Sequence, residues 1–153
     1  MTPLEMQERA MEIFSKGLSW SQAVLAVGQE KLRIDDKYLI KALDAFGGGL
    51  SGYGNVCGAV IGGLAAIGLT KGRSEPGMPV DADMRKVGRI FVNRFKEEVS
   101  EDKLLCSDII NVDWTDANKV KAYRESDERE YCRILVGKTA ILLGEILEKA
   151  QAE

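Results

Sequence analysis

The segment GYGNVCGAVIGGLAAIGL, residues 52–69, joins a run of glycines to a long apolar stretch. Asn55 belongs to the residue types that cap helix N-termini, and we expect a helix over residues 56–69. Gly58 and Gly62 are four residues apart and therefore share one face of that helix. Each glycine costs about 1 kcal/mol of helix propensity relative to alanine, which indicates that something approaches this face closely. A neighbouring helix and a flat cofactor both fit, and helix packing is the simpler interpretation.

Helix signals continue on both sides of this segment. Thr2 and Ser19 are each followed three residues later by glutamate or glutamine, which is the capping-box pattern. Other N-cap candidates precede apolar residues at helical spacing: Asp35 or Asp36, Asp81, Asp116 and Ser126, with a shorter turn of helix from Ser100 to Cys106. No stretch shows the sustained alternation of a strand. We therefore predict an all-α fold, a single-domain bundle of about six or seven helices over residues 1–153.

The composition is that of one ordinary globular domain. The chain has 153 residues, of which 45% are hydrophobic and 29% charged, and a net charge of -3. The negative charge makes nucleic acid a poor candidate partner. The longest apolar stretch, residues 56–69, is too short to span a bilayer about 30 Å thick, so no membrane insertion is expected. Since the N-terminus is charged and helix-like, without the pattern of a secretory signal, we expect a cytoplasmic protein.

Three cysteines, Cys57, Cys106 and Cys132, and the absence of histidine restrict the chemistry. Without imidazole, the histidine-dependent nucleophilic arrangements are excluded. Three cysteines cannot all pair within one chain, and a reducing compartment disfavours structural disulfides. Cys57 would occupy the second position of its helix, where free amides and the helix dipole stabilise a thiolate. Cys57 is therefore the candidate reactive thiol, and a small buried apolar residue is the alternative.

Two glycine patterns resemble nucleotide-binding motifs but lack their context. Residues 47–52 match GxGxxG, yet an amphipathic helix precedes them instead of the buried strand that a dinucleotide fold requires. Residues 63–70 have the glycine spacing of a P-loop without its lysine. We therefore reject both nucleotide interpretations.

The cysteines and their surroundings carry a family resemblance. The run Cys57-Gly58-Ala59-Val60-Ile61-Gly62, Cys106 ahead of an Ile-Ile pair, and Cys132 in REYCRILVGKTAILLGEIL resemble the redox-active C_GCAxxG_C_C family over essentially the whole chain. That family is similar to the iron-sulfur part of split-Soret cytochromes. The resemblance implies a helical fold in which Cys57, Cys106 and Cys132 are metal ligands, with electron transfer as the role and an unidentified redox partner.

The resemblance fails at one position. Trp20 stands where the family has its first cysteine, within GLSWSQAV at residues 17–24. Indole offers only a hydrogen-bond donor, which excludes a site of four thiolates within one chain. A fourth ligand for zinc or an iron-sulfur cluster would then be water, an external group, Ser19, Ser21 or Asp108.

Two alternatives to a metal centre remain open. Two of the three cysteines can form a reversible disulfide, with Cys57 as the expected attacking thiol. Alternatively, Trp20 fills the former metal volume and the chain is a non-redox binding scaffold. Trp20 can also stack on a flat cofactor held against Gly58 and Gly62. A homodimer is consistent with the glycine-rich helix and an exposed tryptophan.

Overall fold

The structure is a computed structural model that describes residues 1–152. It consists of eight α-helices and one short 3-10 helix: α1 (Pro3–Ser15), α2 (Trp20–Leu32), α3 (Lys37–Ala42), η1 (Asp44–Phe46), α4 (Gly58–Lys71), α5 (Met84–Glu98), α6 (Cys106–Ile109), α7 (Ala117–Arg124) and α8 (Asp127–Ala152). In this part of the chain no strand forms beyond an isolated antiparallel bridge between Val56 and Leu105. The predicted all-α class is confirmed, and the expected number of six or seven helices is exceeded.

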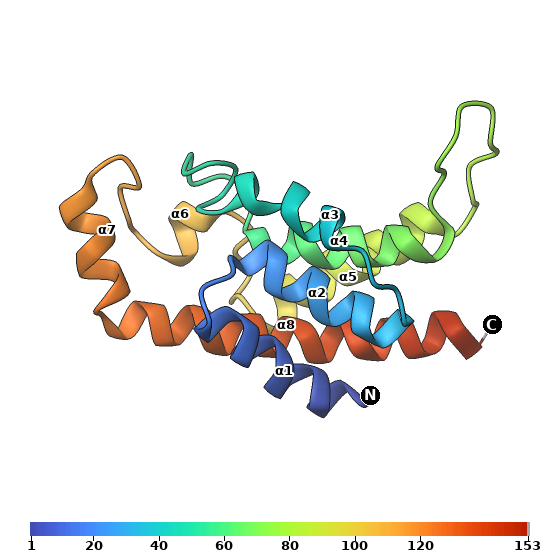
Figure 1. Cartoon of the computed structure of the whole chain (residues 1–153), viewed down its shortest axis with the longest axis horizontal. Coiled ribbons are helices and arrows are strands. Elements are labelled where there is room, and N and C mark those ends of the chain that lie inside the picture. The colour runs from blue at the N-terminus through green and yellow to red at the C-terminus, as the bar shows by residue number, and fades with distance from the viewer. Residues whose placement is uncertain (153) are drawn as a thin grey trace.

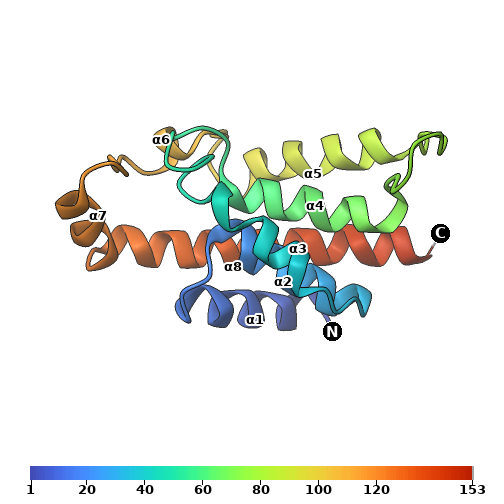
Figure 2. The ribbon, with the colours of Figure 1, turned by 45° about the horizontal axis from the view of Figure 1, so that its top comes forward.

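The longest helix, α8, runs the length of the bundle and carries the core. It has 26 residues, which corresponds to about 39 Å. Helices α1, α2, α4, α5 and α7 all contact it, and Figure 2 shows α4 and α5 lying along it. At one end of the bundle lie α6, α7 and the loop before α4, and at the other end lies the loop of residues 72–83 (Figure 1). None of the helices within residues 1–152 has both the length and the apolarity to cross a membrane.

Most helix starts follow the capping residues that the sequence predicts. Thr2 and Ser19 both form complete capping boxes, and Asp36, rather than Asp35, caps α3. The predicted start of α4 is wrong by two residues, because residues 55–57 are extended and pair with residues 104–106. For the same reason, the helical turn predicted to end at Cys106 is instead α6, which begins there.

Two glycines allow α4 to lie against α2. A Cβ atom at Gly58 would lie 3.3 Å from the Trp20 Cβ atom. At Gly62 it would lie 3.0 Å from the Ser21 carbonyl carbon and closer still to its oxygen. The backbone of α2 thus lies against the glycine face of α4. This arrangement agrees with the prediction that the two glycines serve helix packing. A cofactor-contacting role of Gly58, Gly62 and Trp20 stays a prediction, and it would require these helices to separate.

Candidate redox site

The structure brings the three cysteines to one small cavity. Cys57, Cys106 and Cys132 line it together with Trp20 and Leu135. All three thiols are buried and unpaired. The cavity volume is about 10 Å³, which is close to the least space that one water molecule needs. Residues from four helices therefore enclose three sulfur atoms around a space too small for a cluster of metal atoms.

The isolated bridge between Val56 and Leu105 positions two of the thiols. The Cys57 N–H group donates to the Leu104 carbonyl (2.9 Å), and the Cys106 N–H group donates to the Asn55 carbonyl (2.6 Å). In an antiparallel pair, residues that flank the bridged residues point to the face opposite to them. The side chains of Cys57 and Cys106 therefore leave the bridge on the same side, toward the cavity.

Cys57 is the N-cap of α4, not its second residue as predicted. The amides of Ala59 and Val60 lie near its sulfur atom and favour the thiolate, but burial dominates and raises the pKa of Cys57 to about 12. This direction is opposite to the one expected from a helix N-terminus. The reason is that the thiolate would lose its hydration in an apolar cavity. The free-energy cost of this loss exceeds the stabilisation of the thiolate by the amides and the helix dipole.

Burial also controls the other two thiols. It raises the pKa of Cys106 to about 11, although the Trp114 indole beside it favours the thiolate. It likewise raises the pKa of Cys132, against the opposing influence of Tyr123 and Trp20. All three cysteines are therefore protonated at neutral pH in this closed arrangement.

Three aromatic residues lie together beside the thiols, and one of them, Trp20, lines the cavity. The ring centroids of Trp20 and Trp114 are 5.6 Å apart, and those of Trp114 and Tyr123 are 5.2 Å apart. The Tyr123 hydroxyl group lies near the Cys132 thiol, yet it is buried without a hydrogen-bond partner. Sequence reasoning missed Tyr123, because a single tyrosine in the short charged α7 carries no pattern that points to the site.

A glycine loop closes the cavity from outside. In residues 47–54, Gly49 has a φ of 70° and lines the cavity. A Cβ atom at Gly49 would lie 2.8 Å from the Cys106 Cβ atom, and one at Gly52 would lie 2.9 Å from the Trp114 Cβ atom. These positions need glycine both for the backbone conformation and for the close approach. Residues 47–52, which match GxGxxG in sequence, thus pack over Cys106 and Trp114 instead of binding a nucleotide.

The fourth-ligand candidates lie elsewhere. The Ser19 hydroxyl caps α2, and the Ser21 hydroxyl donates to the Leu43 carbonyl (3.1 Å). Asp108 is exposed and does not line the cavity. Within residues 1–152 no group of three or more cysteine or carboxylate side chains is placed to hold a metal ion. The present arrangement therefore does not fit the zinc or iron-sulfur centre that the resemblance implies.

The comparisons with known proteins give one match. The family model described as "Putative redox-active protein (C_GCAxxG_C_C)" matches residues 19–146, which include all three cysteines and Trp20. The chain belongs to the C_GCAxxG_C_C family. No curated protein and no solved structure matches it. The family description supports a redox role, and this C_GCAxxG_C_C chain has three cysteines where the family name contains four.

The raised pKa of Cys57 predicts a loss of stability in alkali. Above its ordinary pKa of 9.0 the thiol ionises in the unfolded chain, whereas the folded chain keeps the proton until about pH 12. Since the folded state then binds more protons, the free energy of unfolding falls with rising pH across this window and is unaffected below it. Cys57 alone contributes a slope of at most about 1.4 kcal/mol per pH unit.

Urea unfolding between pH 8 and pH 11 checks this prediction. Cys57→Ala is the comparison, because it removes the titrating group and adds no charge. We expect a shallower pH dependence for Cys57→Ala than for the native chain, whatever its stability at pH 8. Parallel curves for the two proteins would show that the Cys57 thiol is not shielded from water.

Proposed function

We propose that this C_GCAxxG_C_C protein is a dithiol redox protein whose Cys57 and Cys106 alternate between two thiols and one disulfide. The observation that carries the proposal is the bridge, which directs both side chains to one face of a shared cavity. Cys132 lies on α8 at the same cavity and is the candidate third thiol. The family description supports the redox role.

The oxidant would be a disulfide of a partner protein or a small molecule. The Cys106 thiolate attacks one partner sulfur, and the other partner sulfur leaves and takes up a proton. The Cys57 thiolate then attacks the Cys106 sulfur of the mixed disulfide, and the second partner thiol leaves. Two electrons and two protons pass from the protein to the partner. Cys106 is the first attacker because it lies directly beneath the glycine loop, where a Cβ atom at Gly49 would meet the Cys106 Cβ atom; the sequence alone predicted Cys57 in this role.

Disulfide closure requires local movement. Diagonal neighbours across an antiparallel pair are about 7–8 Å apart, with their Cβ atoms somewhat closer, whereas a disulfide needs Cβ atoms about 3.5–4.5 Å apart. The glycine loop of residues 47–54 contacts Cys106 directly and is the cover that must open. Opening would also rehydrate the thiols and lower their pKa values toward 9, which makes attack feasible at neutral pH.

Oxidation of the purified protein tests the dithiol proposal. After incubation with oxidised glutathione, we expect the thiols counted in denaturant to fall from three to one. Mass spectrometry should then find a peptide that joins Cys57 to Cys106. Cys132→Ser should keep this disulfide, while Cys57→Ser and Cys106→Ser should each lose it. Three intact thiols after oxidation, or a disulfide that always includes Cys132, would contradict the assignment.

A metal centre, an iron-sulfur cluster or zinc, is the second candidate. One observation favours it: three thiols share one cavity. Such a centre would require the cavity to expand and Trp20 to move. Iron, sulfide and zinc analysis after anaerobic purification tests it, with Cys57→Ala as the control. About one metal site per chain that disappears in Cys57→Ala would replace the dithiol proposal.

The cellular setting follows from the thiol chemistry. We propose a reducing compartment, the cytoplasm, because it keeps three unpaired cysteines reduced between turnovers. The redox partner is a disulfide-bearing protein or small molecule. A homodimer stays a prediction, for which sedimentation velocity is the direct measurement.

A further inference from the structure

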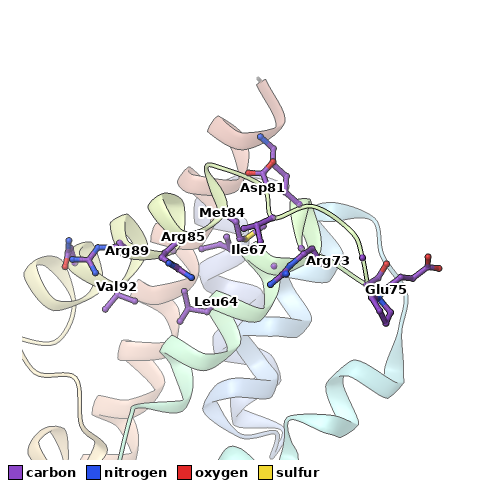
Figure 3. A pocket seen from close by; sticks show the side chains of 18 residues that line it. Leu64, Ile67, Arg73, Glu75, Asp81, Met84, Arg85, Arg89 and Val92 are labelled. Carbon is purple, nitrogen blue, oxygen red and sulfur yellow. The ribbon is translucent and has the colours of Figure 1, made fainter.

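A large groove lies far from the cysteines, at the other end of α4. Its volume is about 940 Å³, within the range of small-molecule sites. Leu64 and Ile67 of α4 and Met84 of α5 form its floor, and the loop of residues 72–83 closes one side (Figure 3). Cys57 caps the start of α4, and the first groove residue on this helix, Leu64, follows seven residues later, so about 10 Å of helix separates them. The groove is independent of the redox proposal.

The lining of this groove is cationic although the whole chain carries a charge of -3. Four basic side chains line it, against two acidic ones: Lys71, Arg73, Arg85 and Arg89, with Glu75 and Asp81. Among residues 1–152 none of the four basic side chains forms an ion pair. Arginines outside the groove differ in this respect. Arg9 of α1 pairs with Glu30, and Arg94 in the C-terminal half of α5 pairs with Glu98.

Two guanidinium groups of the groove face each other. In Figure 3, Arg73 from the loop and Arg85 from α5 point toward each other across the floor, while Glu75 points away. Two cations that face each other without a counterion repel. A ligand that carries negative charge between these groups would remove the repulsion.

We propose that the groove binds a small amphipathic anion. Its carboxylate or phosphate headgroup lies between Arg73 and Arg85, and its apolar chain covers Leu64, Met84 and the exposed Val80. Guanidinium groups bind both headgroups through paired N–H donors, and the apolar floor gains from losing its contact with water. The ligand is a free molecule rather than a bilayer surface, because the floor lies within a concave groove between two helices and a loop.

Calorimetric titration with dodecyl phosphate and with laurate, both below their micelle concentrations, tests this proposal. We expect saturable binding of one molecule per chain. Dodecyl maltoside and dodecyltrimethylammonium share the apolar chain but lack the negative charge, and ethyl phosphate has the charge without the long chain. All three should bind at least about tenfold more weakly, since a charged hydrogen bond or a buried alkyl chain each contributes that much.

Variants assign the binding to this groove. Arg73→Gln and Arg85→Gln should each weaken dodecyl phosphate binding by about tenfold or more. Lys103→Gln is the charge-matched control, because Lys103 is exposed and outside the groove. Gly68 lines the groove, and a Cβ atom there would have no heavy atom within 4 Å. Gly68→Leu should therefore block binding by filling the space, whereas the smaller Gly68→Ala should largely retain it.

Four results would overturn the proposal. The first is equal affinity for the anionic and the cationic dodecyl compounds. The second is binding that Arg73→Gln, Arg85→Gln and Gly68→Leu leave unchanged. The third is adsorption to phosphatidylglycerol vesicles without binding of the monomeric anions, which would make the face a membrane contact. A dimer that dissociates in Arg85→Gln would likewise show that a second copy of the chain occupies the groove.

Discussion

Replacement of Gly62 by alanine is expected to lower the free energy of unfolding by about 2 kcal/mol. The added Cβ atom would lie 3.0 Å from the Ser21 carbonyl carbon and 3.1 Å from its Cα atom, which are backbone atoms that no rotamer change can move. Forcing α2 and α4 apart costs about 3 kcal/mol, and the better helix propensity of alanine returns about 1 kcal/mol. For a chain of this size the melting temperature should fall by about 4–8 °C.

Gly68→Ala is the matched control for Gly62→Ala. Both positions lie in α4, but a Cβ atom at Gly68 meets open space. Gly68→Ala should therefore raise the free energy of unfolding by about 0.5–1 kcal/mol through helix propensity alone. Thermal and urea unfolding of both variants measure the difference. If Gly62→Ala were as stable as Gly68→Ala, the close contact between α2 and α4 would be wrong.

Replacement of Trp20 by cysteine is expected to create a zinc site. Trp20 begins α2, and its side chain lines the cavity that Cys57, Cys106 and Cys132 share. The change removes a large indole and supplies a fourth sulfur, which completes the tetrahedral thiolate set that structural zinc prefers. Zinc content after dialysis against zinc and then buffer should rise from well below one to about one ion per chain, with proton release on binding.

Two further variants isolate the contribution of the sulfur. Trp20→Ala opens the same space without a ligand and should stay largely free of zinc. Trp20→Cys combined with Cys132→Ala returns the site to three thiols and should lose most of the affinity gained. Zinc bound equally by Trp20→Cys and Trp20→Ala would show that the bulk of the indole, and not the missing thiolate, excludes the metal. Zinc bound by neither would show that the four positions do not converge.

Local signals in the sequence were sufficient to predict where most of the helices begin. The capping boxes at Thr2 and Ser19 and the Asp116 cap lie where the sequence predicts them, because a cap depends on only three or four neighbouring residues. The packing role of Gly62 was also recognisable, since a conformationally costly residue inside a helix requires a compensating contact. The family resemblance then added the cysteines as one group.

Features that depend on distant residues were not predictable in this way. The pairing of residues 55–57 with 104–106 has no local pattern, and it shifted the starts of α4 and α6. The pKa of Cys57 had the opposite direction to the one predicted, because burial depends on α6, α8 and the glycine loop rather than on the helix that follows it. Tyr123 reaches the site only because α7 folds back toward Cys132.

The bridge between Val56 and Leu105 also has a consequence for the order of folding. It joins positions about 50 residues apart, so its formation bears the entropy of closing a long loop, whereas the helices need only neighbouring residues. A newly made chain can therefore hold most of its helices while the three cysteines are still exposed to solvent. During that interval each thiol has its ordinary acidity and is open to oxidation or to pairing in the wrong combination. The contacts that bury the sulfur atoms are thus long-range ones, and the thiols stay exposed until these contacts form.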